Sequence, residues 1–198
     1  MKKLSVIAML AASVVATNVQ ARDVSWNYLQ ISHNTLKVDE IDDNMKGYAG
    51  EFSRAFDNNV IIGAEVSTLS IDKYGVRAES NAVSAKVGYF QAFAGQTQWY
   101  AQVGAANQFD HSTSSFAGKD SSTSVYLNAR AGVVGMATDA LQLNGFVEYR
   151  NPMNDAYDSD LWVGAQARFF VKESVSLQAT YAKESDLSML SLGVAYHF

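Results

Sequence analysis

Apolar and polar residues alternate with a period of two in segment after segment of this chain. Such a period puts every second side chain on the same face of a β-strand, so it predicts strands with one apolar and one polar face. Most of the segments have about 10 residues, the length of a tilted strand that crosses a bilayer. The pattern predicts ten strands, over residues 25–32, 47–56, 60–70, 81–91, 98–108, 123–136, 141–150, 161–171, 175–183 and 187–198.

The connections between the predicted strands alternate in length. Tight turns are expected at 57–59, 94–97, 137–140 and 172–174, whereas the polar connections at 35–46, 71–80, 110–122, 151–160 and 184–186 are mostly longer. In transmembrane barrels the short turns are periplasmic and the longer loops extracellular. The predicted fold class is therefore all-β, a closed, antiparallel, up-and-down transmembrane β-barrel. A soluble β-sandwich also alternates in this way and is the alternative.

The first residues have the three parts of a secretory signal peptide. Lys2 and Lys3 precede an apolar run over residues 4–16, and small residues then lead to a predicted cleavage between Ala21 and Arg22. The apolar run is shorter than the roughly 20 residues of a transmembrane helix, which argues against an anchor. We expect a cleaved signal helix over residues 1–21 and an exported barrel domain over residues 22–198.

Charge and composition exclude several classes of function. The formal net charge is −5, and about −7 without Lys2 and Lys3, so the chain is a poor binder of nucleic acid. It has no cysteine, which excludes disulfides, thiolate metal sites and cysteine nucleophiles. Pro152 is its one proline, so strand ladders can continue with little interruption.

Aromatic residues gather near the ends of the predicted strands, as they do at the two interfaces of a membrane. On the side of the short turns they are Phe56, Tyr89, Phe93, Trp99, Phe169, Tyr196 and Phe198. Nearer the loops they are Tyr48, Phe109, Tyr149, Trp162 and Tyr181. Two such belts favour a membrane barrel over a soluble sandwich.

The last predicted strand has a distinctive order of residues. Ser191 is followed by Gly193 and then by aromatic residues at alternate positions, Tyr196 and Phe198, with Phe198 last. This ending resembles the assembly signal of Gram-negative outer-membrane barrels, and the whole mature chain resembles the small outer-membrane β-barrel protein family. The resemblance is clearest over residues 165–198, and it implies a fold and a location in the outer membrane rather than one activity.

The resemblance also implies partners and exposes one difference. The expected partners are outer-membrane lipid and lipopolysaccharide, the barrel assembly machinery, periplasmic chaperones and an extracellular partner that the sequence cannot name. Many members of the family have eight strands, so eight is the alternative to the ten counted. The hairpin around residues 137–140 looks like the additional material.

The polar faces of the predicted strands point into the barrel and carry charges of both signs. These inward residues are Glu51, Glu65, Lys86, Arg130, Glu148 and Arg168. A turn centred on Asn58 places Glu51 opposite Glu65, and the two carboxylates then require a cation, which Lys86 could supply by reaching Glu65. A turn centred on Asp139 places Arg130 opposite Glu148.

We expect an ion-pair network that fills the lumen, because a small barrel packs its own interior and buried charges must be paired. A charged constriction in a narrow pore, or a proton-sensitive gate, is the alternative role of these charged residues.

The loops carry acidic and histidine residues that raise three further hypotheses. A protease would pair His33 or His111 with a nearby aspartate around a bound water. A lipid deacylase would use a serine, a histidine and an acid, as in Asp110-His111-Ser112. Carboxylates could also hold Ca²⁺ or Mg²⁺. The acidic candidates are Asp39, Glu40, Asp42, Asp43, Asp110, Asp120, Asp155, Asp158 and Asp160.

None of these patterns has the ligand spacing or orientation that its chemistry needs, so we expect no catalysis, no metal and no cofactor. The expected function is that of a surface-exposed structural or interaction protein, such as an adhesin. A narrow pore for ions or small solutes is the second hypothesis, and a lipid A-modifying enzyme at the barrel rim is the third.

Overall fold

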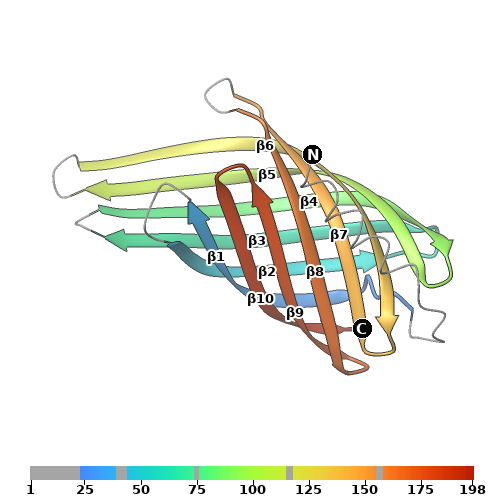
Figure 1. The fold of residues 1–198 in the computed structure, drawn as a ribbon. Helices are drawn as coiled ribbons and strands as arrows, with labels where there is room; N and C mark the ends of the chain where they lie inside the picture. Colours follow the sequence, from blue (N-terminus) through green and yellow to red (C-terminus); the bar gives the residue numbers. More distant parts are fainter. Residues whose placement is uncertain (1–22, 39–43, 74–75, 115–117, 155–157) are drawn as a thin grey trace.

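A computed structural model describes residues 23–38, 44–73, 76–114, 118–154 and 158–198, which form a closed antiparallel barrel (Figure 1). Each strand pairs with its neighbours in sequence, and β1 pairs with β10 to close the sheet. The predicted signal peptide, with Ala21 and Arg22, lies outside the described residues. The ten strands are β1 (Tyr28–Val38), β2 (Asn44–Ala55), β3 (Val60–Lys73), β4 (Val76–Ala94), β5 (Thr97–Ser114), β6 (Gly118–Thr138), β7 (Leu141–Pro152), β8 (Asp160–Lys172), β9 (Val175–Glu184) and β10 (Leu187–His197).

The alternation of the sequence becomes the two faces of the barrel wall. Apolar side chains such as Ile31, Val103 and Leu192 point outward and are 54–67% exposed, whereas polar side chains such as Gln30, Gln102 and Gln178 point inward and are buried. A soluble sandwich would bury its apolar faces instead. An apolar outer face and a polar inner face are the arrangement that a bilayer requires. The predicted closed barrel is confirmed, with ten strands rather than eight.

Where the chain is described, it contains no helix that is long and apolar enough to cross a membrane.

The strands differ greatly in length, so one side of the barrel is much taller than the other. β4, β5 and β6 have 19, 18 and 21 residues, whereas β1, β9 and β10 have 11, 10 and 11. A strand of 20 residues is about 65 Å long, far more than a tilted strand needs to cross a hydrocarbon core of about 30 Å. The sheet of β3–β6 therefore projects past the short strands on the loop side (Figure 1).

This projecting sheet corrects two of the predicted loops. Residues 71–80 and 110–122 were expected to be loops, but β3 continues to Lys73, β4 begins at Val76, β5 continues to Ser114 and β6 begins at Gly118. Away from the bilayer both faces of a strand meet water, so both are polar. The period-two signal then disappears although the strand continues.

One residue of the predicted aromatic belts also lies elsewhere. Trp162 points into the barrel and is 4% exposed, while its neighbours Leu161 and Val163 point outward or sideways. It stands opposite Glu148, which is also buried inside the barrel. The other belt aromatics, including Tyr48, Tyr149 and Phe198, lie on the outer face and are exposed, except for the half-buried Phe109.

Candidate functional site: a filled lumen and a projecting sheet

Lys86 and Glu51 form an ion pair across the middle of the lumen. The register places Glu51 opposite Glu65, as the turn around Asn58 predicts. Lys86 Nζ lies 3.0 Å from Glu51 Oε1, so the cation reaches Glu51 on β2 rather than Glu65 on the adjacent β3. Gly63 explains this reach, because it stands beside Lys86 in the register and a Cβ there would lie 2.9 Å from Lys86 Cε. The lysine stem therefore crosses β3 over a position that has no side chain.

Glu148 holds two arginines. Arg130, opposite it in the register, forms an ion pair with Glu148 Oε2. Arg150 Nε donates to Glu148 Oε1 at 2.6 Å. The guanidinium carbons of Arg130 and Arg150 lie 4.5 Å and 5.1 Å from the ring centroids of Phe146 and Trp162. Sequence reasoning identified Arg130 and missed Arg150, although a residue two positions along the same strand shares its face.

Arg168 is held by neutral groups rather than by a carboxylate. It is 2% exposed and donates to Gln178 Oε1 at 2.9 Å, to Gln30 Oε1 at 3.4 Å and to the Ser25 carbonyl oxygen at 3.4 Å. Its guanidinium also lies 4.2 Å from the ring centroid of Tyr28. Within the described residues Arg168 forms no ion pair, so the predicted network is two ion-paired groups and a separately bound cation.

The residues before β1, 23–27, enter the lumen at the end of the short turns, and we call them the N-terminal segment. Val24 is buried among core residues, and Trp26 packs against Phe90 and Tyr100 with ring centroids 5.8 Å and 5.1 Å apart. Trp26 Nε1 donates to Gln98 Oε1 at 2.7 Å.

Ser25 fastens the same segment to the barrel wall. Its backbone N–H donates to Gln142 Oε1 at 3.3 Å, and its hydroxyl is 2.9 Å from His197 Nδ1. The N-terminal segment therefore closes this end of the barrel, which the sequence did not predict.

The charged layer of the lumen encloses little open space. Around the charged residues the lumen has a cavity of about 30 Å³ lined by Tyr28, Glu51, Lys86, Arg130 and Arg168 among others. That volume holds a water molecule or two. On the loop side, Trp162 and Ala182 are buried beside Leu36, Leu187 and Met189. These five residues belong to β1 and β8–β10, so they cover one side of the lumen.

Three of the C-terminal residues singled out in the sequence lie on the closing strand β10, and Phe198 directly follows it. Ser191 is buried and faces the lumen, whereas Tyr196 and Phe198 are 56% and 55% exposed on the outer face. Gly193 pairs with Ser32 of β1, and a Cβ there would lie 2.8 Å from the Ile31 carbonyl oxygen. The ring of Phe198 stacks on Phe52 of β2 at 6.0 Å between centroids.

The rim residues that the structure describes do not assemble into a catalytic group. Asp110, His111 and Ser112 are consecutive in β5, so His111 points to the opposite face from the other two. His33 packs edge-on against Tyr48 on the outside of the barrel. Of the acidic candidates, Asp39, Glu40, Asp42, Asp43 and Asp155 lie outside the described residues. The residues that are described contain no group of three metal-ligating side chains.

Within the described residues, one edge of the projecting sheet has no strand beside it. β6 pairs with β5 along its whole length down to Gly118, but its pairing with β7 begins only at Tyr126 and Pro152, with a last hydrogen bond from Met153 N to Val125 O at 2.8 Å. Residues 118–124 therefore have a strand partner on one side only, among the residues that the structure describes. All of them except Ser124 are exposed.

No family model and no curated protein matches the chain. Solved structures do. The translocator domain of the autotransporter NalP from Neisseria meningitidis matches all of this chain and 97% of its own, with 10% identity and a TM-score of 0.59. Ail, the attachment invasion locus protein of Yersinia pestis, matches 86% of this chain and 95% of its own at 15% identity and a TM-score of 0.44. Neisserial surface protein A matches 86% of this chain and 96% of its own, at 16% identity and a TM-score of 0.43. At these identities the likeness concerns the fold alone, a closed antiparallel β-barrel.

Proposed function

We propose that this barrel is a non-enzymatic interaction protein of the outer membrane, which binds an extracellular polypeptide through its projecting sheet. The observation that carries the proposal is the unpaired edge of β6 at residues 118–124. Unpaired N–H and C=O groups along a strand recruit another strand, and extended peptides bind proteins by adding to such edges. The charged layer of the lumen supports the same proposal, because its cavity of about 30 Å³ makes solute passage a poor alternative.

The hydrogen-bonding groups of the edge can be assigned to individual residues. The carbonyl oxygen of Val125 faces β7, because it accepts from Met153. Residues at alternate positions of a strand face the same side, so Lys119, Ser121 and Thr123 direct their backbone groups toward the open edge. The N–H of Ser121 donates to its neighbour, Asp120 Oδ1, at 2.9 Å. An incoming strand would replace this local bond and release the Asp120 carboxylate.

The charges on one face of the edge favour a basic partner. Asp120 lies opposite Ser112, and Asp110 lies opposite Ser122, so two carboxylates occupy neighbouring positions on one face of the sheet. Opposite charges on adjacent strands stabilise pairing. The net charge of −5 for the whole chain acts in the same direction at longer range. We therefore expect an extended segment with lysine or arginine facing Asp120.

A second copy of the chain is a poor partner for this edge. Two barrels in one membrane are related by an axis normal to the membrane, so β6 crosses the membrane in the same direction in both. Strands tilted by about 40° from that axis would then cross rather than run antiparallel. The partner is a separate polypeptide.

Binding of a synthetic peptide of alternating lysine and threonine to the full barrel in detergent tests the proposal. Ser121→Pro removes an edge N–H without breaking the ladder to β5, so it should weaken binding about tenfold. Ser121→Ala keeps the N–H and should bind like the unchanged barrel. The same peptide with N-methyl groups at alternate residues should not bind. Equal binding of the methylated peptide, or of the proline variant, would show plain charge attraction and refute strand addition.

A further inference from the structure

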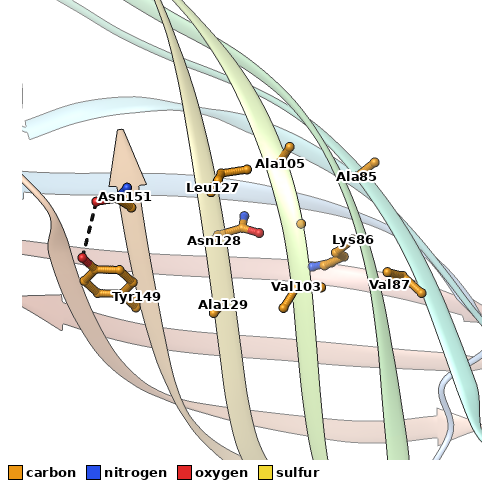
Figure 2. A pocket seen from close by; sticks show the side chains of 11 residues that line it. Ala85, Lys86, Val87, Val103, Ala105, Leu127, Asn128, Ala129, Tyr149 and Asn151 are labelled. Carbon is orange, nitrogen blue, oxygen red and sulfur yellow. Dashed lines mark hydrogen bonds between the residues drawn. The ribbon is translucent and has the colours of Figure 1, made fainter. Parts of the chain in front are cut away.

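The cavity of about 30 Å³ in the lumen has more positive than negative charge in its lining. Lys86, Arg130 and Arg168 line it, and Glu51 is the one carboxylate among the lining residues that the structure describes. Lys86 also borders an outer hollow of about 780 Å³ over β4–β7 (Figure 2), but its amine lies inside the barrel, 3.0 Å from Glu51 Oε1. The cavity is therefore a place of positive potential.

The charged layer around the cavity has the same surplus. Its members are Glu51, Glu65, Glu148, Lys86, Arg130, Arg150 and Arg168. Four positive charges thus stand against three negative ones. Arg168 is 2% exposed and forms no ion pair with the described residues. A buried charge without a counter-charge is costly, and one monovalent anion would neutralise the layer.

Three amides of the cavity lining present donors that lack an acceptor. Gln142 Oε1 accepts from the Ser25 N–H, and Asn144 Oδ1 accepts from the Tyr100 hydroxyl, so the NH₂ group of each amide is left over. The described residues supply no acceptor for these two NH₂ groups or for the NH₂ group of Gln102, which is 8% exposed. Buried donors need acceptors. The cavity therefore suits a ligand that accepts hydrogen bonds from several sides.

We propose that the cavity binds a single halide ion such as chloride, held by Arg168, Lys86 and the three amides. Water would accept some of these hydrogen bonds but carries no charge. A halide ion is little larger than a water molecule and fits the cavity, whereas a carboxylic acid or a phosphate ester is too large. The site goes beyond the proposed function and does not involve the edge of β6, so the two sets of experiments can fail independently.

Crystals of the full barrel grown in sodium bromide test the location of the site, because bromide is identified by its anomalous scattering. One anomalous peak is expected in the cavity, within hydrogen-bond distance of Gln102 and Arg168. A cavity without a bromide peak would overturn the proposal. Peaks on the outer surface alone would show an adventitious ion only, and would overturn it as well.

Urea unfolding at constant ionic strength tests binding in solution. Replacing gluconate, which is larger than the cavity, by chloride should raise the unfolding midpoint, because a ligand of the folded state stabilises it. Gln102→Met removes one donor, so about tenfold more chloride should be needed for the same shift. Gln108→Met is the matched control, because Gln108 faces inward on the same strand β5 outside the cavity, and its response to chloride should be unchanged.

Glu65→Gln provides a variant that should gain affinity, which a folding defect cannot imitate. Glu65 belongs to the charged layer but does not line the cavity. Its neutralisation increases the positive surplus, so chloride should act at a severalfold lower concentration. An equal response to chloride in the Gln102, Gln108 and Glu65 variants would overturn the site.

Discussion

At the scale of single residues, two large side chains of the lumen lie across glycines of a neighbouring strand. Lys86 crosses Gly63, and the ring of Phe146 lies over Gly164, where a Cβ would come within 2.3 Å of the ring. Both glycines stand beside the large residue in the register of the next strand. The empty positions allow long side chains to lie across the sheet, so charges meet partners two strands away.

The pair of Lys86 and Glu51 should contribute to stability in a way that can be measured. Both side chains are largely buried, at 12% and 16% exposure, and Glu65 lies beside Glu51. Lys86→Met leaves two facing carboxylates without their cation and should lower the free energy of unfolding by about 3 kcal/mol. Urea unfolding followed by tryptophan fluorescence measures the change.

Two further variants make that measurement specific. Adding Glu51→Gln to Lys86→Met removes one carboxylate and should recover most of the loss. Lys119→Met changes an exposed lysine of the projecting sheet and should leave the unfolding midpoint unchanged. If the Lys86 variant is as stable as the unchanged barrel, hydration by water rather than the lysine stabilises the charge of Glu51.

At the scale of elements, the short N-terminal segment closes the barrel at the end of the short turns. It supplies Val24 and Trp26 to the interior at the end of the short turns, and its Ser25 contacts both β7 and β10. Among the described residues, the apolar side chains at the opposite end cover only the side of β1 and β8–β10. The segment is therefore the more complete closure of the two.

Replacing both Val24 by glycine and Trp26 by alanine should open the barrel to ions. In a planar bilayer we expect the unchanged barrel to be silent and the double variant to show small conductance steps. Asp23→Ala, at an exposed position of the same segment, should remain silent. Silence of the double variant at all voltages would show that the charged layer closes the lumen without the segment.

At the scale of the whole molecule, closure depends on the pairing of the first strand with the last. β1 and β10 pair over their full lengths from Tyr28 and His197 to Val38 and Leu187. Phe198 follows β10, where its N–H donates to the Asn27 carbonyl oxygen at 3.4 Å and its ring faces outward. Closure leaves no free edge within the bilayer, which is what a membrane demands.

Deleting Phe198 should affect assembly in cells more than the stability of the finished barrel. The residue contributes one long hydrogen bond and one exposed ring to the fold, but it ends the segment that resembles an assembly signal. We expect several-fold less heat-modifiable barrel in outer-membrane fractions, with nearly unchanged refolding of the purified protein in detergent. An equal loss in both assays would mean that Phe198 acts through stability alone.

The sequence by itself determined the number of strands, their inward and outward faces and the pairing within hairpins. Glu51 stands opposite Glu65, and Arg130 stands opposite Glu148, because a tight turn fixes the register of the two strands that it joins. Only the tertiary structure decided that Lys86 reaches Glu51 across Gly63, that the N-terminal segment enters the lumen and that β4–β6 continue past the membrane. Those features depend on barrel closure, which brings distant residues together, and on strands in water, where the alternation that reveals them is lost.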